Sequence, residues 1–334
     1  MARISEQNVE AQQVRKELGM NNLIISSSPH FHSKTRTKNI MLDVIIALIP
    51  AAIAAIIFYG LKAALIIAVC VATSVAAEFF FNIICKKKQT VGDLSAIVTG
   101  LLLALSLSTK VTLWQCFVGS VFAIIAVKCL FGGIGCNFAN PAVTARVFLL
   151  IAFGKVAGGV ATNFASPELV ASATPLEVIS GGSGELPSLL DMLIGNRGGA
   201  IGEGCAIALI LGFIYLLVRR IISWHTPVVY IATAFVLSLI IKQDLTIALY
   251  QVLGGGLLLG AIFMATDYST TPTHLWGKII FGLGCGIITV LIRFFGSYPE
   301  GVSFAILLMN ILTPYIDKIG VPTPLGAGGV KNEK

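Results

Sequence analysis

The chain of 334 residues is 56% apolar and only 12% charged, and its mean hydropathy of +0.90 lies far above that of soluble domains. These values exclude a soluble globular protein and predict a polytopic membrane protein. The formal net charge of +7 does not indicate nucleic-acid binding, because the basic residues stand near the ends of apolar runs and are not interleaved with aromatic residues.

Residues 1–40 are polar and basic, which predicts a cytoplasmic N-terminal tail without a cleavable signal peptide. A spanning helix needs about 20 mostly apolar residues. On that rule, 41–59 and 61–84 form a pair of helices joined at Gly60, and the lysines at 86–88 favour the cytoplasmic side. Residues 321–334 are expected to form a second cytoplasmic tail.

Eight more spans are predicted further along the chain, and a glycine-rich turn at 132–135 separates the second of them from the third. Because this turn leads into Asn140-Pro141, the span that contains them is expected to be broken in its first part. The sequence therefore predicts an all-α polytopic membrane protein with about ten transmembrane helices across 41–320. The eight further spans are 94–109, 113–131, 140–157, 199–218, 226–241, 245–266, 278–295 and 302–320.

The distribution of basic residues orients these spans in the cell membrane. With both termini inside, all but six of the 23 Lys and Arg residues lie on or near the cytoplasmic side, as the positive-inside rule requires. The polar loop 158–198 then lies on the outer face, and within it Thr174 follows small residues and precedes a proline. On composition alone, Thr174 is an ordinary loop threonine. The six outward basic residues are Lys62, Lys110, Lys155, Arg197, Lys242 and Arg293.

The two halves of the chain resemble each other weakly. Residues 99–106 are similar to 255–262, and 137–140 are similar to 303–306. Two halves with an odd number of spans would lie inverted, with broken segments at Asn140-Pro141 and at the glycines 254–256 meeting near the middle of the membrane. The alternative is chance similarity among helices rich in leucine, glycine and alanine.

The cysteines do not predict a metal site within this chain. None of the seven forms a C-x-x-C pair, and most lie in apolar runs, so they are expected to be buried free thiols. Cys129 and Cys136 are the closest pair, beside the glycine-rich turn. An iron–sulfur cluster at this place would need thiolates from a partner subunit.

Six motifs in fixed order carry a resemblance to a known family. They are 28–30 together with 41–50, then 135–142, 173–176, 222–227, 264–272 and 301–310. These motifs resemble the D subunits of Rnf complexes, which are membrane ferredoxin:NAD oxidoreductases, and the related B subunits of the sodium-pumping NADH:quinone reductase. The length of the chain is closer to the Rnf subunits.

The resemblance implies a covalent flavin in the outer loop. In the family, the threonine of a short Ser/Thr-Gly-Ala-Thr motif carries FMN through a phosphoester bond that a separate flavin transferase makes. The matching position is Thr174, preceded by Ser172 and Ala173. This chain departs from the family pattern at Glu168, at Ala171 and at Ser172, where the family has Asp, Ser or Thr, and Gly.

The resemblance also implies a second, non-covalent flavin, riboflavin or a relative, inside the membrane domain. Two stretches are candidates for its pocket, because both offer free backbone groups where lipid would not satisfy them. One is the glycine-rich turn with Asn137 and Asn140, and the other is 266–273, which includes Thr266 and Thr270. The alternative is that both stretches are structural turns between helices.

Four acidic residues lie near membrane depth, where ionisable groups are costly and are treated as functional by default. They are Asp43, Glu78, Glu203 and Asp267. One hypothesis is that some of them line a path for Na⁺ or H⁺, since carboxylate oxygens suit a hard cation. The alternative is that they cap helices or pair with Lys and Arg at the membrane surface.

Taken with the resemblance, these features predict a membrane subunit of a redox-driven Na⁺ or H⁺ pump that works between reduced ferredoxin and NAD. No G-x-G-x-x-G fingerprint follows a predicted strand, so ferredoxin and NAD are expected to bind other subunits of the complex. The rival interpretation is a secondary transporter or channel without a redox cofactor, which the weak repeat and the broken spans would suit.

Overall fold

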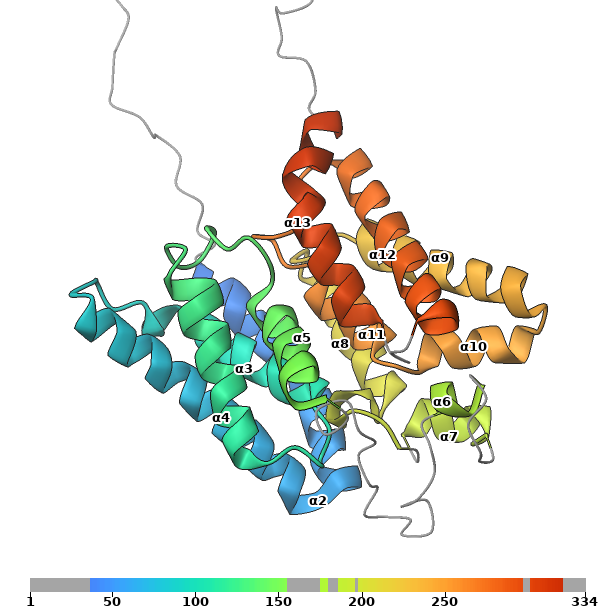
Figure 1. Ribbon diagram of the computed structural model, residues 1–334, viewed down its shortest axis with the longest axis horizontal. Coiled ribbons are helices and arrows are strands. Elements are labelled where there is room, and N and C mark those ends of the chain that lie inside the picture. The colour runs from blue at the N-terminus through green and yellow to red at the C-terminus, as the bar shows by residue number, and fades with distance from the viewer. Residues whose placement is uncertain (1–36, 155–174, 180–185, 196–197, 297–300, 321–334) are drawn as a thin grey trace, which may run out of the picture. The chain divides into compact units, whose positions relative to one another are not determined.

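The computed structural model describes residues 37–154, 175–179, 186–195, 198–296 and 301–320 (Figure 1). Across these ranges the regular elements are helices, and no β-strand occurs. The all-α class expected from composition is therefore confirmed.

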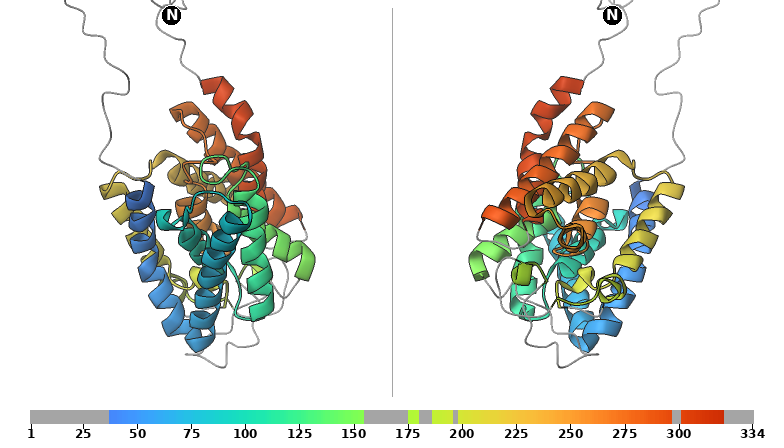
Figure 2. Two further views of the ribbon diagram at one scale, coloured as in Figure 1. Left: turned by 90° about the vertical axis from the view of Figure 1, so that its left-hand side faces the viewer. Right: turned by 90° about the vertical axis from the view of Figure 1, so that its right-hand side faces the viewer.

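The first element, α2 (Thr37–Ile84), is a bent pair of helices rather than one rod. Gly60 has φ 69° and ψ −160°, a backbone conformation that only glycine adopts without strain, and it ends one helix and begins the next. In Figures 1 and 2 the ribbon of α2 turns back on itself, so that its two arms lie as separate rods. The predicted junction of two helices at Gly60 is thus confirmed.

Shorter apolar elements follow α2. The short helix η1 (Val91–Asp93) leads into α3 (Ser95–Ser106), and α4 (Leu113–Val121) continues without interruption as the π-helix η2 (Phe122–Cys129). After the glycine-rich turn, α5 (Pro141–Phe153) begins with Asn140 as its N-cap. Within its described residues α5 is continuous, so the break expected in this span lies before the helix and not inside it.

The remaining elements begin with two short helices, α6 (Pro175–Ile179) and α7 (Leu189–Ile194). The short helix η5 (Ile201–Glu203) then precedes α8 (Ala206–Val218), which packs on α2. Next come α9 (His225–Lys242), α10 (Leu245–Leu253), α11 (Leu257–Leu259) and the π-helix η6 (Gly260–Met264). Finally, α12 (Leu275–Phe295) packs between α9 and α13 (Val302–Gly320).

The predicted span 245–266 is broken. Its two helical parts, Leu245–Leu253 and Leu257–Met264, are bent by 58° at the glycines 254–256. Gly255 and Gly256 both have positive φ, at 62° and 68°, which explains why glycines stand at this point. The interruption predicted at 254–256 is therefore present.

Four of the described helices are long and apolar enough to cross a membrane, and a fifth crossing is added if the bent pair counts as one span. Helices α3, α5 and α8, and α4 with η2, are apolar but shorter. Each predicted span overlaps a helix, and the multi-pass membrane class is confirmed. Ten crossings, two inverted repeats and cytoplasmic termini stay predictions.

Contacts define two opposite ends of the helices. At one end, Met41 in the first turns of α2 and Ser95 at the start of α3 line the same pocket. At the other end, the N–H of Ile201 donates to the carbonyl oxygen of Leu107 (2.9 Å), and the following residues pack against Tyr59 beside the bend in α2. The first arm of α2 between them measures about 28 Å, close to the ~30 Å hydrocarbon thickness of a bilayer. We call these the pocket end and the bend end.

Candidate functional site

A pocket at the pocket end is lined by residues from six parts of the chain. These parts are α2, α3, η2, the turn that leads into α5, α8 with the residues after it, and η6 with the loop that follows. Most of its wall is apolar, as in sites that bind flat organic cofactors. It brings together the two stretches predicted as flavin candidates. The polar residues that line it are Ser95, Thr99, Lys128, Asn137, Asn140, Thr266, Asp267, Tyr268 and Ser269.

Two asparagines of the glycine-rich turn line this pocket and differ in what they bind. The side-chain oxygen of Asn140 accepts the N–H of Ala142 (3.0 Å), and its amide donates to the carbonyl oxygen of Met264 (3.3 Å), so Asn140 caps α5 and ties it to η6. The side-chain oxygen of Asn137 is buried and accepts no hydrogen bond from any residue in the described ranges. An unsatisfied buried acceptor is costly, which suggests that Asn137 has a ligand to bind.

The loop after η6 holds Asp267 in a cluster of hydroxyl groups. One carboxylate oxygen of Asp267 accepts from the hydroxyls of Ser269 (2.9 Å) and Thr270 (3.1 Å). Burial raises the pKa of the Asp267 carboxyl, while these donors oppose the rise. Thr270 does not line the pocket but supports Asp267. Thr266 lines the pocket, and its hydroxyl donates to the carbonyl oxygen of Ile262 (2.5 Å).

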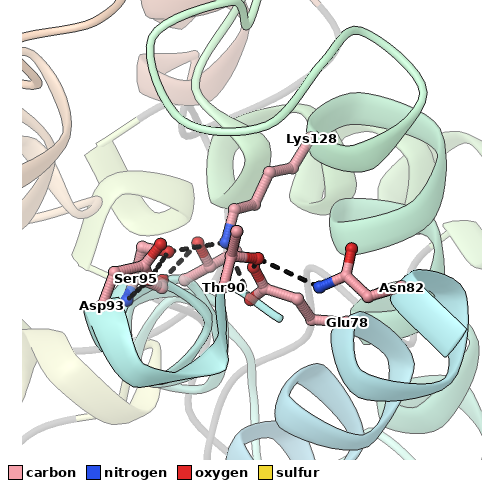
Figure 3. Close-up of polar contacts among 7 residues, drawn as sticks. Glu78, Asn82, Thr90, Asp93, Ser95 and Lys128 are labelled. Carbon is pink, nitrogen blue, oxygen red and sulfur yellow. Dashed lines mark hydrogen bonds and ion pairs between the residues drawn. The ribbon is translucent and has the colours of Figure 1, made fainter. Parts of the chain in front are cut away.

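Lys128, which lines the pocket, belongs to a buried ion pair (Figure 3). The ammonium of Lys128 lies 2.8 Å from Glu78, with exposed fractions of 2% and 1%, and it also donates to the hydroxyl of Ser95 (2.6 Å). The second oxygen of Glu78 accepts from the hydroxyl of Thr90 (2.6 Å). The hydroxyl of Ser95 in turn donates to Asp93 (2.6 Å). This network joins the second arm of α2, the start of α3 and η2.

Asp43, also at the pocket end, is held by a second pair. Its carboxylate accepts from the hydroxyl of Tyr215 (2.9 Å) and from Arg219 (3.0 Å), whose side chain is half exposed. This contact fastens the first arm of α2 to α8. For Asp43, pairing with arginine is therefore the geometry that the structure displays.

The helix break at 254–256 contains further buried charges. Arg293 of α12 donates to the side-chain oxygen of Gln251 and to the carbonyl oxygens of Gly254 and Gly255, each at 3.1 Å, and also to the backbone oxygen of Gln251. Glu203 lies against Gly256, where an added Cβ would stand 2.8 Å from a carboxylate oxygen. Glu203 therefore lies at the helix break, whereas Asp43, Glu78 and Asp267 lie at the pocket end.

Comparison with known proteins identifies the family. A family model described as the NQR2, RnfD, RnfE family matches residues 24–326. The chain belongs to this family. A relative from Acetobacterium woodii, named as the D subunit of a Na⁺-translocating ferredoxin:NAD⁺ oxidoreductase complex, is 44% identical over 315 residues, which cover 93% of this chain and 98% of the relative.

Two further relatives of this NQR2, RnfD, RnfE family member carry names that do not specify Na⁺. One from Clostridium ljungdahlii, named as the D subunit of a proton-translocating ferredoxin:NAD⁺ oxidoreductase complex, is 37% identical over 93% of this chain and 98% of its own. One from Methanosarcina acetivorans, named as the D subunit of an ion-translocating oxidoreductase complex, is 32% identical over 94% of this chain and 100% of its own. The names of these three relatives therefore agree on an oxidoreductase complex and differ in whether they name Na⁺, a proton or no particular ion.

The residues expected to carry covalent FMN in this family member, Ser172, Ala173 and Thr174, lie outside the described ranges. The next described residue is Pro175, and Leu176 is buried in contact with Gly254 and Gly255 at the helix break. The cysteines in the described residues are free thiols, and no cluster of His, Cys, Asp and Glu suited to a metal ion occurs among those residues. Cys85 and Cys136 are exposed, unlike the buried thiols expected.

Sequence reasoning about this family member missed its buried basic residues, among them Lys128 and Arg293. Lys128 is the single charged residue of the predicted span 113–131, a position at which an intramembrane charge signals function. The distribution of basic residues predicts Arg293 only as an outward-facing charge. Both are buried, and both bind groups far away in sequence, Lys128 on α2 and Arg293 on α10.

Proposed function

We propose that this chain is the membrane-spanning D subunit of an ion-translocating ferredoxin:NAD⁺ oxidoreductase. The proposal rests on the family match over 24–326 and on the names of relatives that align over nearly their whole length. Ferredoxin and NAD would bind other subunits. The chain itself would carry electrons across part of the membrane and couple them to movement of Na⁺ or H⁺.

The pocket at the pocket end is proposed to hold the second flavin, riboflavin or a relative. The single observation that carries this is Asn137, whose buried side-chain oxygen is unsatisfied by the described residues while it lines a mainly apolar pocket. A flavin ring has flat apolar faces and a polar edge with an N–H donor, which would satisfy that oxygen. When bound, the flavin supplies electron transfer, and the residues of the chain orient it and exclude water.

Thr174 is proposed to carry FMN through a phosphoester bond made by a flavin transferase. Support comes from the motif at 173–176 and from the position of Leu176. Since Leu176 is buried against the helix break, it anchors the chain two residues beyond the attachment point. A flavin attached at Thr174 would then be tethered two residues away from this anchored leucine.

Flavin content measured on the intact chain tests both sites. The chain is coexpressed with its flavin transferase, and we expect a mass increase of one FMN phosphoester together with in-gel fluorescence. Thr174→Ala should abolish both signals but leave a flavin that is released on denaturation, and Asn137→Ala should lose the released flavin and keep the covalent one. A chain that carries no flavin of either kind would support the transporter or channel interpretation instead.

A further inference from the structure

Lys128 is positioned to act on whatever occupies the pocket. It lies in the π-helix η2, whose wider turn differs from the α-helix that precedes it in the chain, and such turns are frequent at functional sites. Its side chain is almost fully buried, yet it lines the pocket together with Ser95, to which its ammonium donates. Figure 3 shows the side chain extended toward Glu78 and Ser95.

The ion pair is oriented relative to the pocket. Lys128 lines the pocket, whereas Glu78 is not among the lining residues and stands behind the ammonium, with its second oxygen bound to Thr90. The other ionisable groups of the wall are Asp267, which receives hydroxyl donors from its own loop, and Tyr268. The side of the pocket formed by η2 and α3 therefore presents a positive charge.

A buried ion pair needs a reason other than stability. Desolvation of two charges often outweighs their attraction, so that apolar replacements of equal volume are neutral or stabilising. In this pair, Lys128 lines a cavity. An ammonium held beside a cavity by a carboxylate and a hydroxyl is the arrangement that suits a ligand which gains negative charge.

We propose that Lys128 is the charge-compensating residue of the pocket, held in place by Glu78 and Ser95, for a cofactor that becomes anionic on reduction. This inference rests on the proposed second flavin. The ammonium of Lys128 would lie beside a ring that, on taking up two electrons and one proton, would gain one negative charge. The electrons come from reduced ferredoxin through carriers of partner subunits, and the proton comes from water.

The two members of the pair must then act with opposite signs on the reduction potential. Removing the ammonium removes the attraction for the reduced cofactor, and removing the carboxylate removes a repulsion and leaves the ammonium free to face the cofactor. Since an opposite charge within about 4–6 Å shifts an ionisation by about 1–3 units, we expect changes of roughly tenfold or more in the preference for the reduced form. Tenfold corresponds to about 30 mV for a two-electron couple.

The test uses the full-length chain with Thr174→Ala, so that the only flavin on it is the released kind. Its midpoint potential is titrated by absorbance in Lys128→Met, in Glu78→Gln and in the double variant. We expect the potential to fall in Lys128→Met, to rise in Glu78→Gln, and to lie between the parent and Lys128→Met in the double variant. Lys110→Met, an exposed lysine beyond the bend end of α3, is the matched control and should leave the potential unchanged.

The double variant also guards against misfolding, because Lys128→Met alone leaves Glu78 buried without its cation, whereas the double variant removes both charges of the pair. Equal potentials in all four chains, with flavin retained, would overturn the role of Lys128 while leaving the flavin site standing. A parent chain that retains no flavin would overturn the site itself and this inference with it. Shifts of the same sign in both single variants would also refute it, because they would reflect altered packing.

Discussion

Arg293→Met is the substitution whose cost follows most directly from the geometry of the helix break. The guanidinium of Arg293 joins α12 to the end of α10 by donating to Gln251, Gly254 and Gly255. Methionine keeps most of the side-chain volume and removes every donor. The carbonyl oxygens of the break would then be left in a buried place, because Gln251 and the three glycines are all buried.

The expected loss of stability can be bounded from these contacts. Each hydrogen bond from a charged donor contributes about 1.5–3 kcal/mol, but contributions within one cluster do not add fully. Removing one partner of a buried charged interaction typically costs about 3–5 kcal/mol. We expect Arg293→Met to lower the unfolding free energy by about that amount, because glycine backbone can turn only some of its carbonyls toward other donors.

Equilibrium unfolding in mixed detergent micelles measures this loss. Lys278→Met lies on the same helix at a partly exposed position and serves as the control, with an expected change within about 0.5 kcal/mol. A loss of less than about 1 kcal/mol in Arg293→Met would show that the carbonyl oxygens of the break do not depend on the guanidinium, because water or lipid headgroups reach and satisfy them.

Three further predictions concern the break, the pocket loop and the ion path. Gly255→Ala adds a Cβ at φ 62° where Leu176 and Arg293 leave no room, so it should destabilise the chain by at least about 1–2 kcal/mol. It should also lower the yield of covalent flavin measured by mass. The control is Gly92→Ala, which has open space around it and should do neither. Burial raises the pKa of the Asp267 carboxyl, so the folded chain binds that proton more tightly than the unfolded chain does. The unfolding free energy should therefore fall as the pH rises from the ordinary pKa of aspartate toward the raised pKa of Asp267 in the folded chain. Asp267→Asn should remove this part of the pH dependence of unfolding. Ion transport into vesicles should weaken in Glu203→Gln and Asp267→Asn complexes, and transport that stays coupled at the parental rate in both would exclude these two carboxylates from the path.

Much of the fold was predictable because lipid restricts what a chain can do. Apolar runs of the right length gave helices close to their predicted limits, and glycine predicted the bend at Gly60 and the break at 254–256, since both need a backbone that other residues resist. The pocket was predicted in its parts, as two polar stretches between spans. That Asn137 and Thr266 lie in one wall depends on the packing of α5 and η6 against α13, which no local pattern encodes.

The buried cations were harder to predict, because a lysine near the end of an apolar run has two explanations. Lys128 stands shortly before the glycine-rich turn and resembles a cytoplasmic anchor, a position from which long basic side chains usually reach the interface. In the structure Lys128 lies in a π-helical turn, and its ammonium is bound by Glu78 of α2 and Ser95 of α3. A periodicity of 3.6 residues does not foresee a π-turn, so the pairing was beyond sequence reasoning.

The position of Leu176 bears on how electrons would cross the membrane if Thr174 carries FMN. Leu176 contacts Gly255, and from the break to Thr266 in the pocket wall α11 and η6 rise roughly 15 Å, about half of the hydrocarbon thickness. A flavin tethered beside Leu176 and a flavin in the pocket would therefore divide the membrane into two shorter steps. Without the pocket flavin, electrons arriving at the pocket end would face the whole remaining distance. If both flavins are present as proposed, the covalent flavin would need the second one, and variants at Asn137 should stop reduction of the flavin at Thr174 even though they leave its attachment intact.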